Sequence, residues 1–292
     1  MKALVLGGCG MMGREVTRDL SLTSDFDQIV VADSDLERAH ALVDELADPR
    51  LRAEAVDVTI PEAVRRLLGS CDVVANCTTY HHGLALVNDA IACRTPYIDL
   101  GGLYNTPRQL ELGPQAAAAG TTIVLGCGAT PGVTNLMAAA ATTGMDRVDS
   151  VEIAFGSLRP LAASPGLLDT ILDEFSPSTS RFYYEEGSLV SVPAFTGAKN
   201  MSFLPPVGVL ETYYVPHSET HTLPRFLSIQ PRHVSVRGSW QPEIMTAMRL
   251  FLQYGLTSDE PLRVNGATVT PRGFLRAHLL HIAPPMAGPV AL

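Results

Sequence analysis

Near the N-terminus the chain reads KALVLGGCGMMGREVTRDL, from Lys2 to Leu20. Its first residues, Lys2–Gly8, are mostly apolar and predict a buried strand, whereas Met11–Ser21 has the apolar spacing of a helix. Between them stands Gly8-Cys9-Gly10-Met11-Met12-Gly13, a G-x-G-x-x-G pattern. Such a pattern occurs in many turns, but here it joins a predicted strand to a predicted helix. This context predicts a turn that a ligand can approach closely.

A second predicted strand, Gln28–Asp33, completes a β-α-β unit and ends on a carboxylate twenty residues after Gly13. Glycines at these spacings allow a tight turn, close approach of the backbone to a pyrophosphate, and packing of the helix on the strand. The pyrophosphate would lie at the positive N-terminus of the helix. The pattern predicts a dinucleotide site, with a purely structural turn as the alternative. The residues expected to contact the cofactor here are Gly8, Gly10, Met11, Met12, Gly13 and Asp33.

The expected cofactor is NAD. Asp33 would accept hydrogen bonds from the adenosine ribose, and its charge would repel a 2′-phosphate, so NADP is less favoured. Arg38 lies close enough in sequence to weaken that preference. Asp57 and Val58, at the end of a third strand, are expected to edge the adenine pocket, although an ordinary strand end is the alternative.

Short apolar strands alternate with helices from residue 2 to about residue 144. The remaining strands are predicted over Arg52–Val58, Asp72–Thr78, Tyr97–Leu100 and Thr122–Gly126. The remaining helices are predicted over Asp35–Leu46, Pro61–Leu68, Leu84–Cys93 and Pro107–Ala119, with another starting at Pro131 after Thr130 as its cap. This alternation is typical of a parallel sheet covered on both faces. The fold class is therefore α/β, a Rossmann-type doubly wound sheet over residues 1–131, followed by a second α+β domain.

The second domain, residues 132–292, has longer connections and strands rich in Thr and Tyr, typical of an antiparallel or mixed sheet. Strands are predicted over Val148–Phe155, Ser180–Val192, Gly208–Val215, Gln230–Gly238 and Leu262–Val269. Helices are predicted over Leu167–Phe175, Thr220–Phe226, Pro242–Tyr254 and Pro271–His281. We expect this domain to bind the substrate and to form a sheet-to-sheet homodimer.

Composition excludes several classes of protein. With 21 basic against 30 acidic residues the net charge is −9, the wrong sign for binding nucleic acid. The five cysteines are odd in number and have no metal-ligand spacing, which predicts reduced thiols in a cytoplasmic protein. No apolar run reaches the length of a membrane span. No metal is expected either, since the spacing of His217, Glu219 and His221 fits no ligand pattern.

Polar residues after the later strands suggest where the chemistry occurs, because ligands bind outside the carboxyl ends of parallel strands. Cys77, Thr78 and Thr79 follow the fourth strand and should face the nicotinamide, and Tyr80 and His81 come next. The expected substrate contacts are Asp99, Thr130, Asn135, His217 and Arg237. Each of these residues also has a structural alternative. Asp99 could cap a turn, Thr130 could be an ordinary helix cap, and His81 and His82 could merely start a helix. Arg237 could be a surface arginine.

The chain resembles the saccharopine dehydrogenase-like family, and its motifs are closest to lysine 6-dehydrogenase. The segments that carry the resemblance are Leu4–Leu20, Asp72–Gly102, Gly126–Ala138, Leu210–Leu227 and Val234–Gly238. The resemblance implies a Rossmann domain, a homodimer and NAD(P)-dependent oxidation of an amine on an amino-acid skeleton. Thr130 and Phe155 depart from the Asp and Cys usual in saccharopine reductases, which favours a smaller diamino acid. Family members usually continue past the last helix and return to the first domain, so this chain is expected to be shortened or to lack that return.

The sequence thus predicts an NAD-dependent amino-acid dehydrogenase that binds its substrate between the domains and converts an amine to an imine or semialdehyde. The proton acceptor is expected to be His81, Tyr80 or Glu219, with His81 preferred because histidine titrates near neutrality. A saccharopine-type or imine reductase that forms a secondary amine is the alternative enzyme. A non-catalytic NAD-binding protein and a structural subunit are the remaining alternatives.

Overall fold

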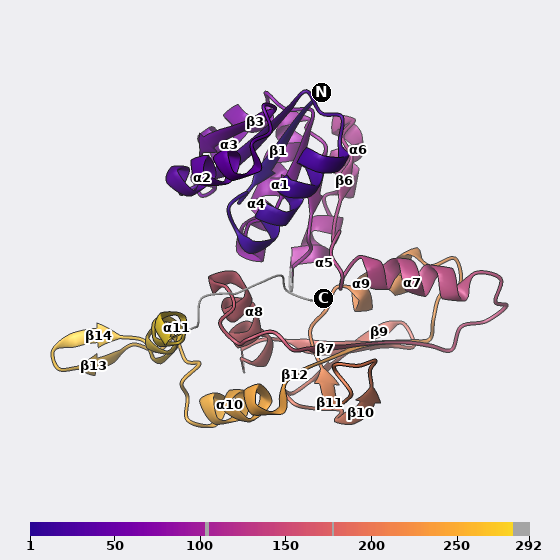
Figure 1. Cartoon of the computed structure of the whole chain (residues 1–292). Helices are drawn as coiled ribbons and strands as arrows, with labels where there is room; N and C mark the ends of the chain where they lie inside the picture. Colours follow the sequence, from indigo (N-terminus) through magenta and orange to yellow (C-terminus); the bar gives the residue numbers. More distant parts are fainter. Residues whose placement is uncertain (103–104, 177, 283–292) are drawn as a thin grey trace. The chain divides into compact units, whose positions relative to one another are not determined.

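The computed structural model describes residues 1–102, 105–176 and 178–282 (Figure 1). The chain divides into two compact units, Met1–Ala140 and Ala141–Leu292. Helix α7 (Val133–Thr142) begins in the first unit and ends in the second. The two units thus meet inside α7, whereas the sequence placed the domain boundary at residue 131, just before this helix.

The first unit is built on a six-stranded parallel sheet with the strand order β3-β2-β1-β4-β5-β6. The strands are β1 (Lys2–Leu6), β2 (Gln28–Asp33), β3 (Leu51–Ala55), β4 (Val73–Asn76), β5 (Tyr97–Asp99) and β6 (Ile123–Val124). The order reverses at β1, which pairs with β2 on one side and with β4 on the other. This is the doubly wound Rossmann topology, and the point of reversal is where such sheets bind ligands. The predicted fold class is confirmed.

Helices cover both faces of this sheet. Helices α1 (Met11–Thr23) and α2 (Leu36–Leu46) pack on one face, against Val5 and Ile29. Helices α3 (Pro61–Leu68) and α4 (Gly83–Cys93) pack on the other, against Leu4 and Leu6. Each of these strand side chains is fully buried, which contributes about 1.5–3 kcal/mol relative to exposure. Two-sided burial explains why the strands read as unbroken apolar runs.

Two predicted helices differ from the structure. The helix expected over Pro107–Ala119 is two helices, α5 (Asn105–Leu110) and α6 (Gly113–Ala119). A proline inside a continuous helix would remove a backbone donor and clash with the preceding turn. The helix is therefore interrupted, and Pro114 lies in the first turn of α6, where proline is tolerated.

The helix expected to start at Pro131 starts at Val133 instead, after a cis Thr130–Pro131 peptide bond. Gly132, at the N-cap position, has φ +126°, and its N–H donates to Oδ1 of Asn135 at 3.1 Å. The carbonyl oxygen of Gly128 would lie 2.1 Å from a Cβ at Gly132. The loop therefore requires glycine there, and the predicted capping role of Thr130 was wrong.

The second unit is built on a mixed sheet with the order β10-β11-β12-β8-β9, and β7 pairs in parallel with β12. The strands are β7 (Ser150–Ser157), β8 (Arg181–Glu185), β9 (Ser188–Val192), β10 (Lys199–Ser202), β11 (Val209–Tyr214) and β12 (His233–Trp240). A separate hairpin joins β13 (Leu262–Val264) to β14 (Ala267–Val269). The α+β prediction for this half is confirmed.

Two of the strands predicted in this half, Ser180–Val192 and Leu262–Val269, are hairpins. Ser180–Val192 turns at Glu186-Gly187, with φ +44° and +91°, and Leu262–Val269 turns at Asn265-Gly266, with φ +50° and +86°. Two successive residues with positive φ are the signature of a two-residue hairpin turn. Asn-Gly is the strongest sequence signal for such a turn, so the second hairpin was visible in the sequence.

Four helices complete the second unit: α8 (Pro165–Phe175), α9 (Glu219–Phe226), α10 (Pro242–Gln253) and α11 (Pro271–Ile282). Leu168, Leu172 and Phe175 of α8 are fully buried against Trp240 and Met248. This cluster is the core of the second unit and fixes α8 to the sheet.

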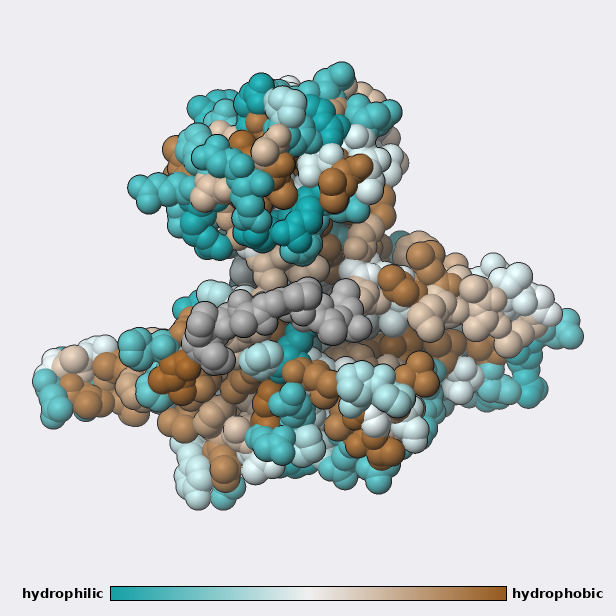
Figure 2. All heavy atoms as spheres, in the orientation of Figure 1, coloured by the Kyte–Doolittle hydropathy of each residue, from teal (hydrophilic) through white to brown (hydrophobic). Residues whose placement is uncertain are grey.

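Helix α7 exposes apolar side chains. Val133, Leu136 and Met137 are 53–71% exposed, and Figure 2 shows tan and brown atoms over the helix that Figure 1 labels α7. Contiguous apolar surface is typical of contact regions. Across the described parts of the chain, no helix is both long and apolar enough to cross a membrane.

All five cysteine thiols lie in the first unit, and burial is the largest influence on the pKa of each thiol. Burial raises the pKa of Cys9 to about 11 and that of Cys77 to about 12, and it also raises the pKa of the other three thiols. At neutral pH these side chains therefore behave as small apolar groups.

Candidate functional site

The glycine turn between β1 and α1 has the geometry of a phosphate-binding loop. Gly7 has φ +70°, and its N–H donates to the carbonyl oxygen of Ala32 at 2.8 Å. A Cβ at Gly13 would lie 2.0 Å from the Gly7 oxygen, so only glycine lets α1 approach the strand this closely. Sequence reasoning missed Gly7, although the Gly7-Gly8 doublet pointed to it.

The N-terminus of α1 can accept an anion. Its N-cap residue, Gly10, has no side chain with which to cap the first N–H groups. The first N–H groups of any helix lack intrahelical partners, so those of Met11, Met12 and Gly13 can bind phosphate oxygens. A Cβ at Gly10 would contact only the Gly7 oxygen, at 3.2 Å. Open space beside Gly10 and a tight fit at Gly13 are what a pyrophosphate cradle requires.

Asp33 and Arg38 both lie beside this turn. Oδ2 of Asp33 accepts from the Cys9 N–H at 3.0 Å, and Nη2 of Arg38 donates to the Cys9 carbonyl at 2.7 Å. Asp33 also accepts from the Asp35 N–H, which fixes its carboxylate at the end of β2. A carboxylate suits the ribose of NAD and a guanidinium suits a 2′-phosphate. The two side chains therefore favour opposite cofactors.

Replacing Asp33 with Ala should raise KM for NAD by roughly 10- to 150-fold, because charge-assisted hydrogen bonds contribute about 1.5–3 kcal/mol each. KM for NADP should fall or stay unchanged, since a repulsive charge is removed. The matched variant Arg38→Ala should instead weaken NADP selectively. Steady-state kinetics with both cofactors measures the two ratios, and an unchanged NAD/NADP ratio in Asp33→Ala would show that Asp33 does not contact the ribose.

Asp57 and Val58 lie in the loop after β3, which ends at Ala55 rather than at Val58. Oδ1 of Asp57 accepts from the N–H and the hydroxyl of Thr59 at 2.9 and 2.7 Å, and these bonds lower the pKa of Asp57. Val58 packs against the core of the unit. Asp57 thus stabilises its own loop, and a contact of either residue with adenine remains a prediction.

The loop after β4 meets the glycine turn. The Thr78 nitrogen and the Cys77 carbonyl carbon lie 3.0 and 3.1 Å from the point that a Gly7 Cβ would occupy. Oδ1 of Asn76 accepts from the N–H and hydroxyl of Thr78, which holds this loop in place. Thr79 then precedes the short helix η1 (Tyr80–His82). Cys77, Thr78 and Thr79 therefore lie where the sequence expected the cofactor-facing loop.

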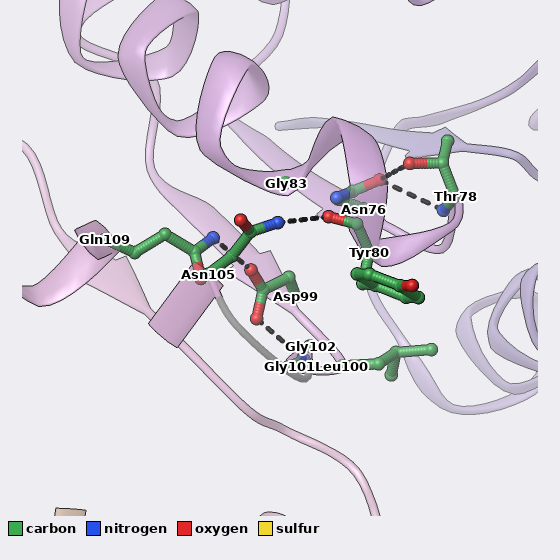
Figure 3. A pocket seen from close by; sticks show the side chains of 10 residues that line it. All are labelled: Asn76, Thr78, Tyr80, Gly83, Asp99, Leu100, Gly101, Gly102, Asn105 and Gln109. Atoms are coloured by element: carbon green, nitrogen blue, oxygen red, sulfur yellow. Dashed lines mark hydrogen bonds between the residues drawn. The ribbon is translucent and has the colours of Figure 1, made fainter. Parts of the chain in front are cut away.

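Tyr80 and His81 lie together on η1. Their rings stack with centroids 4.1 Å apart, and Nδ2 of Asn105 donates to the Tyr80 carbonyl. Figure 3 shows Tyr80 at the edge of a small polar pocket at the ends of β4 and β5. The side chains that line this pocket include Asn76, Thr78, Tyr80, Asp99, Asn105 and Gln109.

Asp99 is the centre of this pocket's hydrogen-bond network. Its carboxylate is 5% exposed and accepts from the Gly101 N–H and from Gln109, both at 2.9 Å (Figure 3). It also accepts from the Gly126 N–H at 2.9 Å and from the Tyr97 hydroxyl at 3.2 Å. The carboxylate thus joins the loops that follow β5 and β6. These bonds fit the turn-capping alternative, and the substrate contact of Asp99 stays a prediction. Sequence reasoning missed the partners, because Gly126 and Gln109 are distant along the chain.

Asp99→Asn should lower the free energy of unfolding by roughly 2–4 kcal/mol, because the amide nitrogen would face donors and leave buried N–H groups unpaired. The effect on substrate KM should be small in comparison. Thermal unfolding and steady-state kinetics measure the two effects. A protein of unchanged stability with a strongly raised substrate KM would return Asp99 to the role of substrate contact.

The second unit carries three of the predicted residues, His217, Glu219 and Arg237. Nδ1 of His217 lies 2.7 Å from Oε2 of Glu219, and both side chains are buried. Arg237 on β12 is 7% exposed, its guanidinium lies 4.1 Å over the Tyr214 ring, and Nη1 donates to the Gly197 carbonyl. Nε of Arg237 is buried and has no hydrogen-bond partner within the described chain. Arg237 is therefore no ordinary surface arginine.

Asn135 caps α7, as described above, so its side chain serves the fold at that point. Among the described residues, no group of three or more His, Cys, Asp and Glu side chains is arranged to hold a metal ion. Glu219 is the only predicted proton acceptor in the second unit, whereas Tyr80 and His81 belong to the first.

Comparison with known proteins places this geometry in a family. Residues 3–124 match the family model described as saccharopine dehydrogenase NADP binding domain. The resemblance to saccharopine dehydrogenases is confirmed. The matched residues include the glycine turn, Asp33 and the Asp99 network. The first unit is therefore similar to the NADP binding domain of saccharopine dehydrogenases, while the closer likeness to lysine 6-dehydrogenase remains a prediction.

Two curated proteins are similar to this chain. A saccharopine dehydrogenase [NADP(+), L-glutamate-forming] of Saccharomyces cerevisiae is 28% identical over 181 residues, 62% of this chain and 38% of that protein. A carboxyaminopropylagmatine dehydrogenase of Synechocystis sp. is 21% identical over 293 residues, 96% of this chain and 72% of that protein. The chain thus spans well under half the length of the first relative.

A solved structure extends the likeness to both units. Apo saccharopine dehydrogenase (L-Glu forming) from Saccharomyces cerevisiae superposes with a TM-score of 0.67 at 21% identity, over 90% of this chain and 60% of that one. At this identity the match shows a shared fold. The shared fold therefore includes the second, mixed-sheet unit.

Proposed function

We propose that the chain is an NAD(P)-dependent oxidoreductase that acts on a C–N bond of an amino acid, converting an amine to an imine or semialdehyde. Lysine or a near relative is the preferred substrate class. The observation that carries the proposal is the glycine turn with Asp33 at the end of β2, inside a domain that matches a saccharopine dehydrogenase model.

The residues present fit a nicotinamide dinucleotide. The α1 N-terminus would hold the pyrophosphate, Asp33 the adenosine ribose, and the Cys77–Thr79 loop would lie beside the nicotinamide. The cofactor supplies hydride transfer. The protein binds and orients the substrate, and we propose that Arg237 holds its carboxylate.

NAD is our first choice of cofactor on account of Asp33, while Arg38 and the NADP(+) in the first relative's name favour NADP. A panel of amino acids assayed with each cofactor, followed at the NADH absorbance band, tests the proposal. Turnover of an amino acid supports it; binding of NAD(H) without turnover of any amine would leave a non-catalytic dinucleotide-binding protein.

The second candidate is a saccharopine-type or imine reductase that forms a secondary amine. The names of both curated relatives favour it over a simple amine dehydrogenase. Supplying saccharopine with oxidised cofactor, and an amino acid plus an oxo acid with reduced cofactor, distinguishes the two. Activity only when both components are present would select the reductase.

We also propose a homodimer formed through the second unit. Sedimentation at micromolar protein concentration tests it, and a monomer there would contradict it.

A further inference from the structure

The second unit buries a pair of ionisable side chains, His217 and Glu219. His217 follows β11, and Glu219 begins α9. Glu219 is fully buried and His217 is 8% exposed. Burial alone would lower the pKa of His217, but the Glu219 carboxylate outweighs it, so the pKa is raised above its ordinary value. Burying such a pair costs free energy, and perturbed buried groups gather at functional sites.

Hydrogen bonding fixes which ring nitrogen of His217 is free to react. An ionised carboxylate can only accept, so Nδ1 carries the proton shared with Glu219. Nε2 makes no hydrogen bond within the described chain, and 10% of the side chain stays exposed. Nε2 is thus the atom at which a ligand's proton can be taken up or returned.

A second carboxyl group lies close to this pair. Glu174, near the end of α8, is 3% exposed, and its Oε2 has no hydrogen-bond partner among the described residues. Burial raises its pKa to about 7, while His217 and Arg181 act in the opposite direction. Sequence reasoning missed Glu174, although an acid beside the apolar positions of a core-facing helix was a visible signal.

The charged groups around His217 come from three elements. Glu219 lies on α9, Glu174 on α8, and Arg181 on β8 donates to the backbone carbonyls of Glu174 and Ser176. Asp173 lies next to Glu174 and raises its pKa. The ring of His217 also lies near that of Phe155, with the two centroids 5.7 Å apart. The two glutamates thus raise the proton affinity of His217, whose ring lies beside that of Phe155.

The same sheet offers a comparison. Nδ1 of His233 contacts Oε2 of Glu185 at 2.5 Å, the same atoms as in the buried pair. There the glutamate side chain is 43% exposed, against 0% for Glu219. Only the His217–Glu219 pair therefore has its carboxylate fully removed from solvent.

We propose that His217 is the proton-transfer residue of the amine oxidation, with Glu219 and Glu174 as its positioning residues. The inference rests on the proposed function and replaces His81 as the preferred acceptor. It assigns Glu174 a role that the sequence did not suggest.

The proposed step balances as follows. The C–H bond next to nitrogen breaks, and its electron pair leaves as hydride to the oxidised nicotinamide that the proposed function requires. The N–H bond gives its proton to Nε2 of His217, and the electron pair of that bond forms the C=N bond. The carbon is oxidised, the nicotinamide is reduced, and the imidazole becomes an imidazolium that Glu219 stabilises. In the reverse direction the imidazolium returns the proton.

The pH dependence follows from the protonation state. Only neutral His217 accepts a proton, so oxidation should rise with pH through the raised pKa of His217. Glu219→Gln removes the charge that raises this pKa, and the acidic limb should move to lower pH. Glu174→Gln should move it the same way by a smaller amount. His217→Gln should remove the limb and lower kcat by about 10²–10⁴-fold, the usual contribution of general acid–base catalysis.

The experiment compares pH–rate profiles of the full chain with those of His217→Gln, Glu219→Gln and Glu174→Gln, with His233→Gln and Glu185→Gln as matched controls. Side-chain ¹⁵N NMR of His217 gives its tautomer and titration independently of turnover. The expected result is an Nδ1-protonated ring, a downward shift in Glu219→Gln, and control profiles like the wild type. Thermal melts identify any variant that fails to fold, in which case Glu174→Gln still tests the proposal.

The outcomes separate this inference from the function on which it rests. If no amine is turned over with either cofactor, the proposed function fails. If turnover is present but His81→Ala removes the acidic limb and His217→Gln keeps it, the inference is overturned and the function stands. A His217 that titrates at its ordinary pKa in the wild type, unmoved by Glu219→Gln, also overturns it.

Discussion

Gly13→Ala is expected to abolish dinucleotide binding and to destabilise the first unit. A Cβ at this position would lie 2.0 Å from the Gly7 carbonyl oxygen and 2.8 Å from two backbone carbons, so the strand and helix must separate. Overpacking of this kind costs about 1–3 kcal/mol or more of stability. Displacing the α1 N-terminus also removes charge-assisted bonds to the pyrophosphate, which corresponds to roughly a 100-fold or larger loss of affinity.

Two alanine variants serve as controls for this prediction. Gly10→Ala should keep the fold, because its nearest neighbour is the Gly7 oxygen at 3.2 Å, yet it fills the space beside the turn and should still weaken cofactor binding. Gly113→Ala, at a helix start with nothing within 4 Å, should change neither property. Cofactor titration and thermal melts measure both effects. Wild-type affinity in Gly13→Ala would place the dinucleotide elsewhere.

Arg237→Ala is expected to lower kcat/KM for the amino acid by roughly 10- to 150-fold, the equivalent of one charge-assisted contact of about 1.5–3 kcal/mol. Arg237 is buried, and its guanidinium contacts the Gly197 carbonyl oxygen and the Tyr214 ring, neither of which carries a negative charge. A guanidinium in this state suits the carboxylate of an amino-acid substrate. Affinity for the cofactor should remain within about twofold, since the α1 turn is untouched.

The control for Arg237 is Arg232, an exposed arginine directly before β12 that pairs with Glu186. Arg232→Ala should leave the kinetics unchanged. Arg237→Lys should recover part of the loss, because lysine keeps the charge but neither the planar fork nor the stack. Unchanged amino-acid kinetics in a folded Arg237→Ala would move the carboxylate contact to Arg159, Arg225 or Arg232.

Most elements of the first unit could be predicted because β1 and β2 are buried on both faces and the helices that cover them have apolar stripes. Where prediction failed, contacts distant in sequence decided the outcome. Strand β10 is polar, KNMS, and is a strand only because it pairs with β11. The break before α6 was different, since Pro114 was visible and was read as part of one helix.

For the candidate site, the glycine turn and Asp33 could be predicted because their function depends on local spacing. The role of Asp99 could not, since its donors come from loops that only the folded sheet brings together. His217 and Glu219 were visible as neighbours, but sequence spacing does not show that both are buried or that Glu174 lies close by. Burial and side-chain partners are properties of the tertiary structure.

The raised thiol pKa of Cys9 has a consequence for the durability of the protein. Cys9 stands in the middle of the glycine turn, with its N–H bound by Asp33 and its carbonyl by Arg38. With a pKa of about 11, only about one side chain in ten thousand is a thiolate at neutral pH. Peroxide attacks thiolates, and an oxidised sulfur would put a bulky anion beside the place proposed for the pyrophosphate. The turn can therefore keep a cysteine at this position and still withstand oxidative stress.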